Sequence, residues 1–198
     1  MSALLAPAPE TASAHTRGVD NRLAYLGFAL AYLLGHGGTA LTYGDAPLLA
    51  LPTWIPIALL TLGLAIGTTA SIVSGVVAQR KMNRDAAREA SLIGMAWITG
   101  FTGLFLAIMG LVTITGDPSL QTIVWPAASG FLVGLIYLAE GAVRRDPVHY
   151  ALGTLLIIAA PSALFLPTAA ALGALALVGG AAYLVALMLI RRRRFTID

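Results

Sequence analysis

Residues 53–79 read TWIPIALLTLGLAIGTTASIVSGVVAQ, a mostly apolar stretch without a single charged side chain. A helix needs about 20 such residues to cross a hydrocarbon core about 30 Å thick. This stretch therefore predicts a transmembrane helix. Five other stretches meet the same requirement: 23–43, 91–114, 119–143, 147–166 and 168–190. The sequence thus predicts an all-α polytopic membrane protein with six transmembrane helices.

The composition supports this class. Of the 198 residues, 58% are hydrophobic and 11% are charged, and the mean hydropathy is +0.85. Soluble domains are about 45–50% apolar and about 25% charged. This chain would leave too little polar surface to stay in solution, which excludes a water-soluble enzyme, a disordered chain and a nucleic-acid-binding domain. The chain has no Cys, so it forms no disulfide and no thiolate metal site.

The basic residues indicate the orientation. The twelve Lys and Arg residues form four clusters: Arg17 and Arg22; Arg80, Lys81, Arg84 and Arg88; Arg144 and Arg145; and 191–194. With six spans, all four clusters fall on one side of the membrane. The opposite loops hold Asp45 and Asp117 but no Lys or Arg. The positive-inside rule then predicts a multi-pass plasma-membrane protein with both termini in the cytoplasm.

Three parts follow from this pattern. Residues 1–20, rich in Ala and Pro, are expected to be a flexible cytoplasmic tail. Residues 21–190 form the predicted six-helix domain, and residues 191–198 a basic cytoplasmic tail.

The even-numbered spans share a design, since each opens at a proline, carries a small-x-x-x-small pair and ends in basic residues. The pairs are Gly63 and Gly67, Gly130 and Gly134, and Ala176 and Gly180. Small residues at this spacing let helix backbones approach closely in lipid. The pattern predicts three helical hairpins around a central axis, and ordinary helix packing is the alternative.

Glu140 is the only acidic residue within the predicted spans. Ionisable groups inside a membrane are candidates for function by default. Arg144 follows one helical turn later, so an i,i+4 ion pair near the cytoplasmic boundary is one interpretation. A gating or proton-linked role is the other.

His36 lies in the middle of the first span, in Leu34-Gly-His-Gly-Gly38. The three glycines weaken the helix, and membrane proteins tolerate a break only beside a cavity or against other protein. A pore-lining or pH-sensing histidine is one interpretation, and a neutral histidine packed between helices is the other. His149, at the start of the fifth span, is expected to be an ordinary interfacial residue.

A substrate path is predicted from His36 together with polar and aromatic residues of other spans. Hydroxyls such as Thr68 and Ser71 can line a path for a polar solute, although they also bond their own helix backbone. Phe101, Phe131 and Tyr137 are candidates for hydrophobic constrictions, and lipid-facing aromatic residues have the same sequence pattern.

Sequence motifs of catalysis are absent. There is no phosphate-binding Gly-rich motif, no His-Glu-x-x-His and no Gly-x-Ser-x-Gly, and the three histidines do not fall at metal-ligand spacing. No two carboxylates lie together within a span. We therefore expect neither an enzyme nor a cofactor or metal.

The order of features resembles the succinate–acetate permease family and, more loosely, the acid-activated urea channels. The similarity lies in GLAIGTTASIVSGVVA (63–78), the charged loop after it, and GFLVGLIY (130–137). The family's first-span signature, Asn-Pro-Ala-Pro-Leu-Gly-Leu, is not preserved, because Asn21, Leu26 and Gly27 remain but both prolines are missing. The resemblance implies a six-helix protomer that assembles as a homo-hexamer, with one pore per protomer.

Two functions fit these features. The first is a small channel or permease for a small weak acid or a neutral polar solute. The second is a non-conducting accessory membrane subunit of a larger transporter or signalling complex. Neither involves nucleic acid.

Overall fold

The computed structural model describes residues 19–195, with side chains for residues 19–191. The described chain is helical and contains no strand. Its elements are α1 (Arg22–Leu30), a π-helical segment (Ala31–His36), α2 (Gly37–Thr42), α3 (Trp54–Gln79), α4 (Arg84–Thr115), α5 (Gln121–Arg144), α6 (Pro147–Ser162) and α7 (Thr168–Phe195). Short 3-10 turns precede α5 (Pro118–Leu120) and follow α6 (Ala163–Phe165). The all-helical prediction is confirmed for these residues.

Five helical segments, α3 to α7 with those two turns, are long and apolar enough to cross a membrane. The remaining predicted stretch, 23–43, is also helical, because α1, the π-helical segment and α2 follow one another without a break. The expected weakness around His36 is therefore a π-helical segment, in which the helix widens but continues. Most of the predicted tail 1–20 lies outside the described residues.

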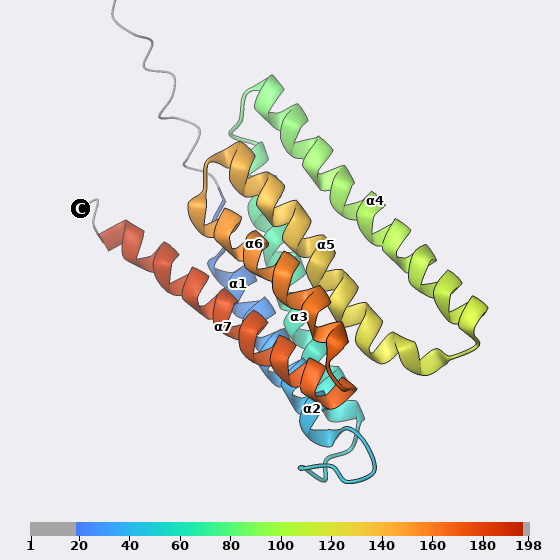
Figure 1. Cartoon of the computed structure of the whole chain (residues 1–198). Coiled ribbons are helices and arrows are strands. Elements are labelled where there is room, and N and C mark those ends of the chain that lie inside the picture. Colours follow the sequence, from blue (N-terminus) through green and yellow to red (C-terminus); the bar gives the residue numbers. More distant parts are fainter. Residues whose placement is uncertain (1–18, 196–198) are drawn as a thin grey trace, which may run out of the picture.

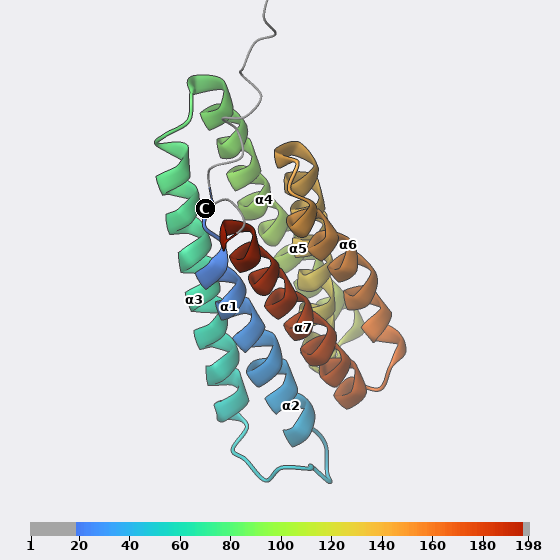
Figure 2. The ribbon, with the colours of Figure 1, turned by 90° about the vertical axis from the view of Figure 1, so that its left-hand side faces the viewer.

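The helices run up and down in one bundle (Figure 1). The start of α1, the α3–α4 and α5–α6 turns and the C-terminal end of α7 lie at one end. The α2–α3, α4–α5 and α6–α7 connections lie at the other (Figures 1 and 2). The described basic residues therefore gather at a single end of the bundle, which we call the basic end.

Two helices extend beyond their predicted apolar stretches. α4 begins at Arg84, where the Asn83 side chain caps it by accepting the Ala86 N–H at 2.9 Å. α7 continues through the arginine run to Phe195, so part of the predicted tail 191–198 is helix. Arginine is a good helix former, and cations at a C-terminus interact favourably with the helix dipole.

We call the continuous helix of α1, the π-helical segment and α2 the first helical run. The first small-residue pair packs α3 against this run. A Cβ on Gly63 would lie 2.5 Å from the Ala31 nitrogen, and one on Gly67 would lie 2.6 Å from the Phe28 ring. The third pair also faces this run, since a Cβ on Gly180 would lie 2.5 Å from Leu33. Both pairs thus lie at close helix–helix contacts.

The most extensive contact between two helices of the bundle is the one between α5 and α6. A Cβ on Gly134 would lie 2.8 Å from the Ile157 nitrogen, and one on Gly153 would lie 2.7 Å from the Gly134 oxygen. The three predicted hairpins are therefore not equivalent, because α5 packs most extensively against the first helix of the next hairpin.

Replacing Gly153 with Ala should destabilise the protein, because the added methyl meets the backbone of α5. The two helices would have to move apart to accommodate it, which weakens their packing. We expect a loss of about 1–3 kcal/mol in the free energy of unfolding, measured by thermal or denaturant unfolding in lipid nanodiscs. Gly103→Ala is the matched control, since a Cβ there meets open space. A Gly153→Ala variant as stable as this control would contradict the described packing.

Candidate functional site

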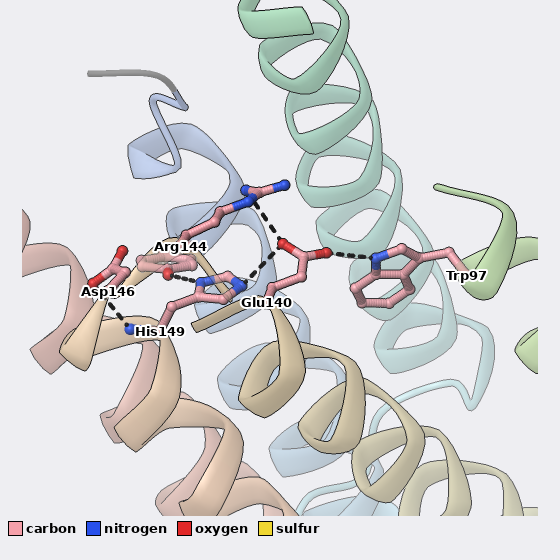
Figure 3. Close-up of polar contacts among 6 residues, drawn as sticks. Trp97, Glu140, Arg144, Asp146 and His149 are labelled. Atoms are coloured by element: carbon pink, nitrogen blue, oxygen red, sulfur yellow. Dashed lines mark hydrogen bonds and ion pairs between the residues drawn. The ribbon is translucent and has the colours of Figure 1, made fainter. Parts of the chain in front are cut away.

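The Glu140 carboxylate is buried at the basic end of the bundle, with 7% of the residue exposed. Its Oε1 accepts a hydrogen bond from Trp97 Nε1 of α4 at 3.0 Å. Its Oε2 lies 3.3 Å from Arg144 Nη1 and 3.5 Å from His149 Nε2. Figure 3 shows the three partners converging on this one side chain. The i,i+4 contact with Arg144 is the one that the sequence suggested.

Local sequence explains how His149 reaches Glu140. α5 ends at Arg144, and the next residue, Arg145, adopts a left-handed conformation (φ 53°). Asp146 then caps α6, because its side chain accepts the backbone N–H groups of Val148 and His149 at 3.0 and 3.4 Å. This tight corner sets α6 against α5, so His149 in the first turn of α6 faces Glu140 in the last turns of α5 (Figure 3).

Tyr25 connects the cluster to α1. Its hydroxyl lies 2.6 Å from His149 Nδ1, and its ring stacks on the imidazole at a centroid distance of 6.1 Å. In a neutral imidazole, one ring nitrogen donates and the other accepts. A proton on Nε2 suits the carboxylate that this nitrogen faces, and with that tautomer the Tyr25 hydroxyl is the donor to Nδ1. We call Tyr25, Trp97, Glu140, Arg144 and His149 the Glu140 cluster.

Aromatic side chains fill the interior beside this cluster. Tyr183 of α7 is 1% exposed, and its ring centroid lies 5.9 Å from that of Tyr25, 5.7 Å from Tyr32 and 6.4 Å from Tyr137. Tyr137 in turn lies 4.1 Å from the His149 ring. The interior at this level is therefore packed with tyrosine rings.

Three residues of the predicted substrate path contact this network of rings, with Tyr137 and His36 buried and Phe101 half-buried. Tyr137 is buried beside the Glu140 cluster, and Phe101 stacks on Trp97 at 6.0 Å. His36 is 8% exposed and lies edge-on to the Tyr32 ring at 5.1 Å. A chain of ring contacts thus connects His36, through Tyr32 and Tyr183, to the cluster.

The other three residues of that path do not join them. Thr68 and Phe131 are exposed on the outside of the bundle. The Ser71 hydroxyl is half-buried and donates to its own helix, to the Gly67 carbonyl at 2.9 Å. Ser71 therefore bonds its own helix backbone, which is the alternative interpretation of these hydroxyls.

Hollows on the described surface lie elsewhere. One of about 500 Å³ lies between Leu23 and the α3 residues from Ala65 to Ser74, and one of about 400 Å³ lies at the α5–α6 corner. Neither is lined by a residue of the predicted path.

Sequence reasoning missed three members of the cluster. The prediction that His149 is an ordinary interfacial residue is wrong, because the structure buries it to 5% exposure between Tyr25 and Glu140. The signal was the two-residue corner at Arg145 and Asp146, which forces α6 back along α5. Tyr25 and Trp97 carried no local signal, since their partners lie 124 and 43 residues away in the chain.

The cluster has the chemistry of proton exchange and ion pairing. Within the described residues, no group of three or more His, Asp or Glu side chains could hold a metal ion.

Comparisons of the chain with protein families, with curated proteins and with solved structures found no match.

Replacing Tyr25 with Phe should lower stability by about 1–2 kcal/mol, because His149 Nδ1 loses its partner inside the protein. Unfolding in nanodiscs measures the effect. Tyr150→Phe serves as the control, since Tyr150 is exposed and should lose almost nothing. Equal stability of the two variants would show that the Tyr25–His149 contact does not hold α1 to α6.

Proposed function

We propose that this chain is a six-span plasma-membrane protein that conducts a small weak acid or a neutral polar solute, as a channel or permease with one path per protomer. The observation that carries the proposal is the Glu140 cluster, which holds the only acidic side chain within the predicted spans and buries it. Buried charges in membranes are costly and mark pathways and gates. No catalytic activity is proposed.

The gathering of basic residues at one end supports six spans with both termini in the cytoplasm. The first helical run packs against α3 and α7 along the bundle, as a spanning segment would. With an even number of spans, the start of α1 and the end of α7 share the cytoplasmic side. The positive-inside rule makes that side the basic end.

In this proposal, the Glu140 cluster is the cytoplasmic gate of the path. Glu140 holds α4 through Trp97 and α6 through His149, and Tyr25 holds α1. These contacts, together with the aromatic rings of Tyr137 and Tyr183, close the interior of the bundle beside the cluster. Conduction therefore requires the helices to separate here, toward the path that continues to His36.

A non-conducting accessory subunit is the second candidate, and α4 favours it. Ile108 is the only residue of this 32-residue helix that is buried in the described protein, and α4 contacts α5 moderately and α3 little. Lipid, a second copy or another subunit covers the rest in the membrane. The first proposal, a channel or permease, includes assembly as a homo-oligomer. The resemblance to the succinate–acetate permease family implies that this oligomer is a hexamer.

The topology can be tested on a cysteine-free background, because the chain has none. Asp20, Asp45, Asp85 and Asp117 are all exposed and follow one another at alternate ends of the bundle. In intact cells, a membrane-impermeant maleimide should label single Cys substitutions at Asp45 and Asp117 only. Those at Asp20 and Asp85 should react after permeabilisation. Labelling of Asp20→Cys in intact cells would show that the first run does not span.

Conduction is tested by flux of acetate, formate and urea into liposomes that hold the purified protein. We expect flux of one of them above empty liposomes. The Glu140→Gln variant should raise it about tenfold, since the loss of one charged contact of about 1.5 kcal/mol shifts a closed–open equilibrium by that factor. Glu89→Gln, at an exposed position of α4, should leave the flux unchanged.

Absence of flux with intact, folded protein would contradict the first proposal. A stoichiometric partner that co-purifies from the native membrane would then support the accessory role.

A further inference from the structure

The end of the bundle opposite the basic end exposes large apolar side chains. We call it the far end, and it comprises the α2–α3, α4–α5 and α6–α7 connections (Figures 1 and 2). The three most exposed large apolar residues of the described chain are Phe165 (91%), Ile114 (86%) and Leu48 (83%). Phe165 lies in the turn after α6, Ile114 in the last turn of α4, and Leu48 in the α2–α3 connection. All three therefore belong to the far end.

Charges are distributed in the opposite way. The turns at the basic end are charged, since the α3–α4 turn carries Arg80 and Lys81 and the α5–α6 corner carries Arg145. The far-end connections hold no Lys or Arg, and Asp45 and Asp117 are their only charged residues. A single exposed apolar residue is ordinary on a protein surface. Here, however, the most exposed ones gather at the end that lacks cations, so the two ends suit different surroundings.

The α2–α3 connection turns back on the first helical run. The Leu49 N–H donates to the Leu41 carbonyl of α2 at 2.9 Å, so this part of the connection lies beside the last turn of α2. Leu41 belongs to the predicted span 23–43. The connection then leads into α3, which begins with the exposed Trp54, and tryptophan favours the boundary between membrane and water.

We propose that the far end is a lipid-binding surface, embedded in the headgroup layer of the membrane. Leu48, Ile114 and Phe165 insert toward the acyl chains, while Asp45 and Asp117 face water. The bundle is then seated asymmetrically, because the far end stops within the membrane interface and the basic end projects into water.

Lipid is the occupant that this surface fits. The apolar residues come from three separate connections, and they continue the exposed apolar sides of the long helices, such as Ile57 on α3 and Leu106 on α4. In a membrane those sides contact acyl chains, so the far end extends the same surface. A segment that lies in the interface combines apolar residues on one side with polar ones on the other, and the two aspartates supply the polar side.

Insertion of the far end rests on the proposal that the bundle spans a membrane. It requires neither conduction nor a choice of which end is cytoplasmic. A protein without flux and a far end exposed to water are thus separate results.

Nitroxide spin labels test the insertion, because the chain has no Cys to compete for them. Leu48→Cys and Phe165→Cys place single labels at the far end, and both side chains are so exposed that little packing is lost. In nanodiscs, molecular oxygen concentrates among the acyl chains and the nickel–EDDA complex stays in water. We expect power-saturation EPR to show oxygen colliding with both labels more than nickel–EDDA does, as it should for Ile57→Cys on α3.

Asp45→Cys is the matched control, since it lies in the same connection as Leu48 and should show the reverse order of collisions. Asp85→Cys at the basic end should do the same. An excess of nickel–EDDA collisions at Leu48→Cys or Phe165→Cys would place the far end in water and overturn the proposal. Few collisions with either reagent would show that a second copy or another subunit covers the far end, which would overturn it equally.

Discussion

The carboxylate of Glu140 has to keep its partners inside a bundle that is otherwise nearly free of charge. An ionised group without partners in such surroundings costs several kcal/mol, so the helices that supply its partners are held in place. α4 supplies Trp97, α5 supplies Arg144, α6 supplies His149, and α1 secures His149 through Tyr25. The position of four helices at the basic end thus depends on this one side chain.

The small residues make that arrangement possible. His149 faces Glu140 because Gly134 and Gly153 let α5 and α6 approach backbone to backbone, and the volume that remains between the helices is filled by tyrosine rings around Tyr183. Buried tyrosine rings thus occupy the interior of the described bundle beside the cluster. Opening of the proposed path would use a deformable element, and the π-helical segment Ala31–His36 is the irregular part of the first helical run.

The sequence predicts those features that depend on local composition. Apolar length alone located helix in all six stretches, and the spacing of Glu140 and Arg144 placed them within reach. It did not predict the helical ends of α4 and α7, because their arginines and alanines favour helix outside the apolar stretch. It also missed His149, Tyr25 and Trp97, since contacts between residues far apart in the chain depend on how the helices pack, which local spacing does not encode.

The central claim is that Glu140 is an ionised carboxylate shared between a guanidinium and an imidazole inside the bundle. Infrared difference spectroscopy of the wild type against Glu140→Gln, in lipid at neutral pH, measures this directly. Our account predicts that the substitution removes a carboxylate stretching band. Removal of a protonated carboxylic acid band instead would show that Glu140 is neutral, and would contradict the account.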